Sequence, residues 1–233
     1  MNNAAGEGAD KLVGRRTIFN ASALSLFIYA GFFSLAYLYL ETGMGALILF
    51  SSVQATMMGW GLYKGERPSF MGWLGIGGAL LGLIYLLSPG LSAPHPVGAV
   101  LMAAAGVGWG VYSLRGRGSQ KPILNSAQNF TGAVPWAIIF LGLYAARLDL
   151  SAYGIVLALS SGVITSAIGY VIWYKVLPFL RVSEASIMQL SVPVIAALGG
   201  IVFAGEPITL RFIGASLAIL GGVALNIYSG RKA

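Results

Sequence analysis

The chain has 233 residues, of which 57% are hydrophobic and only 9% are charged. A soluble domain usually carries about 25% charged residues, so this composition excludes an ordinary water-exposed surface and predicts a single domain in lipid. The chain has no cysteine, which excludes disulfides and thiolate metal sites, and its net charge of +7 could indicate nucleic acid unless the charges lie beside a membrane.

A polar segment at 1–20 precedes a series of apolar runs. A hydrocarbon core about 30 Å thick needs about 20 apolar residues in a helix, and the first run is too long for the core of a signal peptide. The eight runs of this length are 21–40, 43–63, 70–88, 96–114, 127–146, 152–174, 184–204 and 209–228. We therefore predict an all-α polytopic membrane protein with about eight transmembrane helices.

The 14 Lys and Arg residues divide unevenly between the two sides of such a bundle. One side carries Lys11, Arg15, Arg16, Lys64, Arg67, Arg115, Arg117, Lys121, Lys175, Arg181, Arg231 and Lys232. Only Arg147 and Arg211 lie on the other side. Because cytoplasmic loops collect Lys and Arg, we predict an inner-membrane protein with both termini in the cytoplasm. The positive charge then forms a rim beside anionic lipid, and no nucleic acid partner is needed.

The chain matches itself when it is shifted by 140 residues, which places Gly65-Glu66 on Gly205-Glu206. The same shift places Ser51 on Ser191, Gly59 on Gly199, Leu80 on Leu220, Gly82 on Gly222 and Gly90 on Gly230. The runs 43–63 and 70–88 therefore match 184–204 and 209–228. The matched runs are five helices apart, and because five is odd the copies run in opposite directions, as in the inverted repeats of secondary transporters.

The repeated Gly-Glu dipeptide has a local explanation as a tight hairpin. Glycine can adopt the left-handed conformation that ends a helix, and a proline such as Pro207 suits the first turn of the next helix. The glutamate is expected to favour the positive end of that next helix. The alternative is a gating role for Glu66 or Glu206.

Glycines at GxxxG spacing predict close contacts between helices, because small residues let backbones approach in lipid. The pairs are Gly78 with Gly82, and Gly106 with Gly110.

Three segments together resemble the drug/metabolite transporter superfamily, in its EamA branch: GALILFSSVQATMMGWGLYKGERPS, GVGWGVYSLRGRG and QLSVPVIAALGGIVFAGEPITLRFIGASLAILGGVAL. The resemblance covers roughly residues 20 to 230. It implies two inverted repeats of five helices each, which work by alternating access. In this chain it implies a partial first repeat of three helices at 21–90 and a complete second repeat at 94–229, without the first two helices of the family. A truncated gene product, a late start codon and a genuine eight-helix variant all remain possible explanations.

No acidic residue falls in the middle of a predicted span. An intramembrane carboxylate is the usual mark of a proton relay, so the sequence indicates neither a carboxylate coupling site nor a highly charged substrate. Uncharged polar residues remain, namely Gln54 in the second span and Gln189 in the seventh. Pro193 has no N–H and should free the carbonyl of Gln189 for a donor from a neighbour, water or substrate. The alternative is a proline kink satisfied by packing.

Two aromatic pairs and one amide complete the predicted substrate site. Trp109 and Tyr112 share a helix face, as do Tyr170 and Trp173, and inward-facing pairs would line a cavity for a flat or amphipathic solute. The alternative is an aromatic belt at the membrane interface. Asn129 would line the cytoplasmic mouth of that cavity, with interhelical hydrogen bonding as its alternative role.

We predict a permease for a small organic metabolite or xenobiotic, in contact with membrane lipid, and a homodimer is one arrangement open to it. The alternative is a truncated or non-transporting subunit that needs a partner to complete its bundle. His95 is the only histidine and lies apart from acidic residues, so no metal site, cofactor or enzyme activity is predicted.

Overall fold

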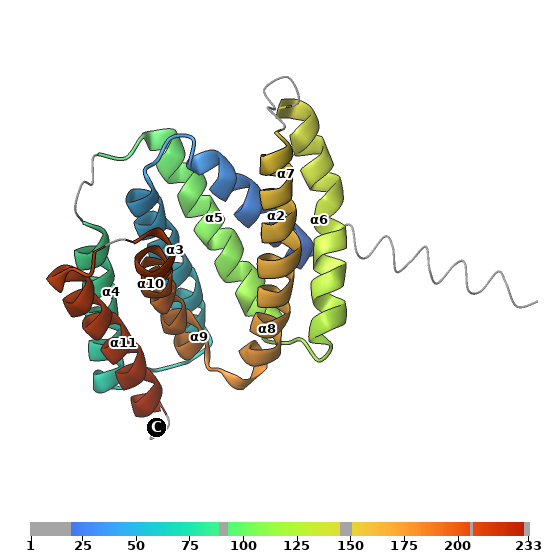
Figure 1. Ribbon diagram of the computed structural model, residues 1–233. Helices are drawn as coiled ribbons and strands as arrows, with labels where there is room; N and C mark the ends of the chain where they lie inside the picture. The colour runs from blue at the N-terminus through green and yellow to red at the C-terminus, as the bar shows by residue number, and fades with distance from the viewer. Residues whose placement is uncertain (1–19, 89–92, 145–150, 206, 231–233) are drawn as a thin grey trace, which may run out of the picture.

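The computed structural model describes residues 20–88, 93–144, 151–205 and 207–230, and these residues form a bundle of helices (Figure 1). Backbone groups in a bilayer must be satisfied within their own segment, and long apolar runs therefore fold as helices. Their bounds are α2 Ala21–Ala36, α3 Thr42–Tyr63, α4 Phe70–Leu87, α5 Pro96–Gly116, α6 Pro122–Tyr144, α7 Ala152–Leu159, α8 Ile168–Val176, α9 Val182–Met188, α10 Val192–Ala204 and α11 Leu210–Gly230.

Two of the predicted spans are interrupted by irregular helix. The π-helical segment η2, Ser160–Ala167, joins α7 to α8, and the 3₁₀ segment η3, Leu177–Phe179, follows α8. A second 3₁₀ segment, η4, Gln189–Ser191, joins α9 to α10. The described part of the chain thus holds eight helical rods, of which six are long and apolar enough to cross a bilayer. The prediction of an all-α polytopic membrane protein is confirmed.

The structure carries the same 140-residue repeat as the sequence. Shifting the bounds of α3 and α4 by 140 gives 182–203 and 210–227, where α9–α10 and α11 lie. Gly65 (φ +92°) and Gly205 (φ +68°) end the matched helices, and they are the only described residues with positive φ. The shift also carries α2 onto 161–176, which is η2 without its first residue together with α8.

The helices α4 and α11 form the closest seam, and they pack antiparallel (Figure 1). The backbones meet at Gly75 against Gly222, and again at Gly82 against Ala215. The 140-residue shift carries Gly75 to Ala215 and Gly82 to Gly222, so the two contacts exchange places. The repeats are therefore related by a two-fold operation that passes between α4 and α11.

The GxxxG expectation is confirmed for three of its four glycines. Gly106 lies against the carbonyl of Leu49 and the side chain of Ser52 on α3, and Gly110 lies against Thr56 on the same helix. Gly82 belongs to the α4–α11 seam. Gly78 was predicted wrongly, since a Cβ at that position would have no neighbour within 4 Å.

Glu66 does not cap α4, the helix that follows it. Ser69 caps α4 by accepting the N–H of Gly72 at 3.1 Å. The two carboxylate oxygens of Glu66 instead accept the N–H groups of Val182 at 2.8 Å and Ser183 at 3.0 Å, at the start of α9. The predicted partner of Glu66, the start of α4, is therefore wrong. The fold places the α3–α4 hairpin beside the start of α9, which belongs to the other repeat. Glu206 lies outside the described residues.

The basic loops meet at one end of the bundle, the lower end in Figure 1. Arg115 donates to Ser22 at 2.7 Å, and Arg117 donates to the carbonyl of Leu180 at 2.8 and 3.0 Å. Arg181 pairs with Glu184 at 3.2 Å. The described basic loops of the predicted cytoplasmic side therefore share one physical end of the molecule, whereas Lys11, Arg15, Arg16, Arg147, Arg231 and Lys232 lie outside the described residues.

Candidate functional site

A cavity of about 510 Å³ lies between the two repeats, and it is open along Thr165, Gly169 and Val192, which are exposed. Its walls come from α2, α3, α5, η2–α8 and the junction of α9 with α10. The lining residues are Tyr29, Leu49, Phe50, Val53, Trp109, Thr165, Ser166, Gly169, Tyr170, Trp173, Met188, Gln189, Ser191 and Val192. None of these side chains carries a formal charge, so the cavity suits an uncharged or weakly polar solute.

The irregular segments η2 and η4 both face this cavity. Thr165 and Ser166 come from η2, and Gln189 and Ser191 come from η4. Departures from α-helical geometry expose backbone and hydroxyl groups that a regular helix would cover, and they recur at functional sites. The sequence predicted the break at Gln189, but it gave no signal for the π-helical segment.

Gln189 is buried, with 7% of its surface exposed, and its amide is held from three directions. Its Oε1 accepts the indole N–H of Trp109. Its Nε2 donates to the carbonyl of Ala185 at 3.1 Å and contacts the sulfur of Met57 at 3.1 Å. The amide is therefore fixed in orientation at the cavity wall, and Oε1 keeps a second lone pair for a ligand donor.

Pro193 acts on the backbone rather than on the cavity. Pro193 has no N–H to donate to the carbonyl of Gln189. That carbonyl instead accepts the N–H of Val192 through the 3₁₀ turn. Pro193 itself is buried and is not among the lining residues. The geometry therefore matches the alternative of a proline kink whose freed carbonyl is satisfied without a substrate.

The predicted aromatic pairs come together in the interior. The ring of Trp109 lies 4.8 Å from that of Tyr29 and 5.1 Å from that of Tyr170, centroid to centroid. Trp173 donates its indole N–H to Ser113 at 3.0 Å. Tyr112 is fully buried behind Trp109, with its ring 5.6 Å away, and does not reach the cavity. The rings of Trp109, Tyr170 and Trp173, together with Tyr29, form an aromatic wall of the cavity rather than an interfacial belt.

Asn129 lies beyond that wall, at the basic end. It is 2% exposed, accepts a bond from Asn20 at 3.0 Å and donates to the hydroxyl of Tyr174 at 3.0 Å. It also lines a separate polar pocket of about 380 Å³ together with Arg115 and Ser22. Its hydrogen bonds match the interhelical alternative, and the aromatic wall separates it from Gln189.

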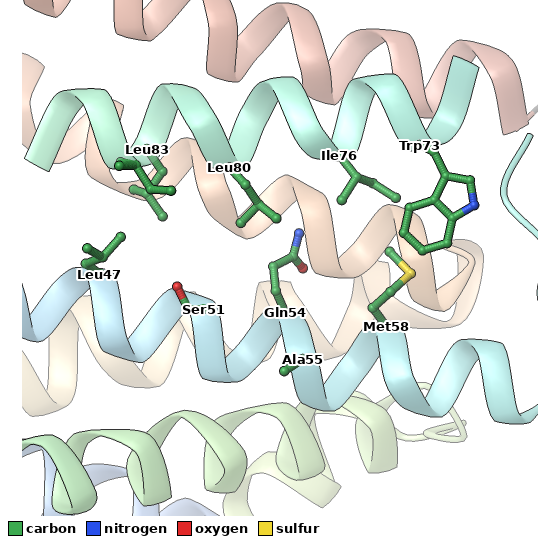
Figure 2. A pocket seen from close by; sticks show the side chains of 10 residues that line it. Leu47, Ser51, Gln54, Ala55, Met58, Trp73, Ile76, Leu80 and Leu83 are labelled. Carbon is green, nitrogen blue, oxygen red and sulfur yellow. The ribbon is translucent and has the colours of Figure 1, made fainter. Parts of the chain in front are cut away.

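Gln54 is not brought together with the other predicted residues. It lies in a groove between α3 and α4, and none of the groove's lining residues lines the central cavity (Figure 2). The preceding residue, Val53, faces the central cavity instead. Successive helical residues point about 100° apart, so depth in the membrane alone did not indicate which side of α3 Gln54 takes.

Tyr29 is a lining residue that sequence reasoning missed. The 140-residue shift places it on Gly169, which lines the same cavity and precedes Tyr170. Extending the repeat to the first span would have identified Tyr29. Among the described residues, no three His, Cys, Asp or Glu side chains come together as a metal site.

Comparisons with known proteins agree with this architecture. The model of the EamA-like transporter family matches residues 96–228. An uncharacterized protein of Pseudomonas aeruginosa is 46% identical over 203 residues, which cover 87% of this chain and 71% of that protein.

The chain belongs to the EamA-like transporter family. The resemblance to the drug/metabolite transporters is thereby confirmed, and the chain is a multi-pass membrane transporter of that type.

Relatives with lower sequence identity carry transporter names. An uncharacterized transporter of Archaeoglobus fulgidus is 25% identical over 215 residues, or 90% of this chain and 76% of the relative. The threonine/homoserine exporter RhtA of Escherichia coli K12 is 28% identical over 181 residues, or 73% and 60%. A crystal structure of another protein, 20% identical, shares the fold with a TM-score of 0.75 over 89% of this chain and 76% of its own.

Proposed function

We propose that this EamA-like protein moves a small organic metabolite or xenobiotic across the inner membrane by alternating access. The substrate would be flat or amphipathic and would carry no strong net charge. It would bind in the central cavity, against the aromatic wall of Trp109, Tyr170 and Trp173, with Gln189 as its main hydrogen-bonding partner.

The observation that carries this proposal is the position of Gln189. Its buried amide lies at a helix break, beside an uncharged cavity of about 510 Å³ between two antiparallel repeats. Sites of secondary transporters occur at such breaks, at the interface of inverted repeats. A rocking motion of the repeats about the α4–α11 seam would expose the cavity to each side in turn.

The cavity also bears on substrate choice within the family. A relative is named as a threonine/homoserine exporter, but an amino acid carries a carboxylate and an ammonium group. No lining residue of this cavity offers a charged partner to either group. We therefore infer a preference for neutral solutes, with threonine and homoserine as the comparison compounds.

A transport panel tests the proposal. Membrane vesicles containing the protein would be screened with neutral aromatic and amphipathic solutes, alongside threonine and homoserine. Gln189→Ala removes the amide and releases Trp109, and should lower transport of an accepted solute at least tenfold. The exposed Gln120, in the loop after α5, gives the control Gln120→Ala, which should transport normally. Equal transport by wild type and Gln189→Ala would remove Gln189 from the site.

The second candidate function is that of a subunit in a larger bundle, and an uncovered helix face favours it. The helix α5 covers α2 and α3 of the first repeat: Gly108 lies against Ser25 and Ile28, and Gly110 lies against Thr56. The 140-residue shift carries these three residues to Thr165, Ile168 and Ala196, which are all exposed. The described part of α7 has no buried residue. A helix from a second copy, seated as α5 is seated, would cover this face.

Cysteine cross-linking in membranes tests the second candidate, and the absence of native cysteine makes each site unique. Ala196→Cys should give a cross-linked dimer with a short bis-maleimide. Leu81→Cys, which is 68% exposed on α4, is the matched control and should stay monomeric. Monomers from both variants would contradict a homodimer through this face.

A further inference from the structure

We propose that the groove between α3 and α4 is a second binding site, for a small neutral molecule that carries one hydroxyl or amide group on an apolar body. The groove has a volume of about 340 Å³. Its lining is Leu47, Ser51, Gln54, Ala55, Met58, Trp73, Ile76, Leu80, Leu83 and Ile84.

The evidence for a ligand is the side chain of Gln54. It is 5% exposed, and neither Nε2 nor Oε1 has a hydrogen-bond partner among the described residues. Figure 2 shows the amide pointing from α3 across the groove towards Ile76 and Leu80 on α4. A buried polar group without a partner is destabilising, so an amide with two such groups calls for a partner from outside.

A phospholipid tail does not satisfy this requirement. Gln54 lies twelve residues after the start of α3 and nine before its end, so it is about 18 Å and 14 Å from the helix ends at a rise of 1.5 Å per residue. At that depth a bilayer presents only hydrocarbon. An acyl chain would fill the groove and leave the amide unpaired, whereas a hydroxyl can donate to Oε1 and accept from Nε2.

The size and walls of the groove fit the same class of molecule. Its volume lies near the lower limit of the 300–1,000 Å³ that is usual for small-molecule sites. Apart from Gln54 and Ser51, the lining is apolar or aromatic. The site therefore suits one substituted ring that partitions into the membrane and enters sideways.

The groove is separate from the central cavity, with α3 as the wall between them. Met57 contacts Gln189 on the cavity side, and the next residue, Met58, lines the groove. An occupant of the groove would therefore touch a helix that also holds Gln189, without entering the proposed substrate site.

Photolabelling tests this site independently of transport. The probe is trifluoromethyl-diazirinyl benzyl alcohol, added to the purified protein in phosphatidylcholine nanodiscs, and labelled residues are located by mass spectrometry. We expect labels on α3 and α4 at groove residues. Excess benzyl alcohol should lower this labelling at least fivefold, whereas toluene at the same membrane concentration, which lacks the hydroxyl, should leave it unchanged.

Two variants complete the experiment. Gln54→Leu keeps the apolar volume and removes the amide, so groove labelling should fall at least fivefold. Leu80→Trp keeps the amide and fills the groove, and it should also block labelling, which covers the case in which Gln54→Leu fails to fold. Labelling that persists in both variants, equal competition by toluene, or labels confined to the central cavity around Trp109 would each overturn the proposal.

Discussion

Glu66 connects two helices that are distant in sequence, because its carboxylate accepts the N–H groups of Val182 and Ser183. Glu66→Gln keeps one acceptor oxygen but turns an NH₂ group towards the second N–H. We expect the free energy of unfolding to fall by about 1–2 kcal/mol, since hydrogen bonds to charged groups are worth about 1.5–3 kcal/mol. Thermal unfolding in detergent measures this. Glu41→Gln is the control, because Glu41 makes no capping bond; equal midpoints would contradict the assignment.

The hydroxyl of Tyr174 joins the polar pocket to the aromatic wall. It accepts from Asn129 at 3.0 Å and donates to the carbonyl of Tyr112 at 3.3 Å. Tyr174→Phe leaves a buried amide donor unpaired, so we expect a loss of about 1–3 kcal/mol in the free energy of unfolding. Tyr153→Phe removes a hydroxyl from a side chain that is 74% exposed and should change nothing. A loss of the same size in both variants would show that the bonds of Tyr174 are not the cause.

At the scale of helices, the seam between α4 and α11 depends on the absence of side chains. A Cβ at Gly75 would press on the backbone carbonyl of Gly222, whereas a Cβ at Gly78 on the same helix meets nothing within 4 Å. Gly75→Ala should therefore cost about 2 kcal/mol by overpacking. Gly78→Ala should be neutral or stabilising by up to about 1 kcal/mol, because alanine favours helix. Thermal unfolding of the two variants side by side decides this, and equal effects would place the seam elsewhere.

The helices were largely predictable from sequence, and their lateral arrangement was not. The lengths of the apolar runs predicted the bounds of the helices to within a few residues, except that α6 begins at Pro122 rather than at 127. Pro193 indicated the break at Gln189, because a missing N–H is a local property. The partner of Glu66 and the groove around Gln54 depend on which helices become neighbours. A single sequence indicates neighbouring helices only through its internal repeat, which matches Tyr29 to Gly169 in the same cavity.

At the scale of the whole molecule, the two-fold relation places the candidate sites. The central cavity lies where the repeats face each other, and the residues that line it come from both copies. The groove around Gln54 belongs to one copy only, because the shift of 140 residues replaces Gln54 by the buried Val194. The matched position on α10 thus carries an aliphatic side chain where α3 carries an amide.

The same relation fixes how the loops must lie if the bundle crosses a membrane. The glycine turns at Gly65 and Gly205 end matched helices that run antiparallel, so they must face opposite compartments. Lys64→Cys should react with a membrane-impermeant maleimide only from the cytoplasmic side, because basic loops stay inside. Pro207→Cys should react only from the other side. Both positions are exposed. The wild-type chain has no cysteine and is therefore the unlabelled control. Labelling of both from one side would exclude the inverted arrangement, and with it a cavity that opens alternately to the two compartments.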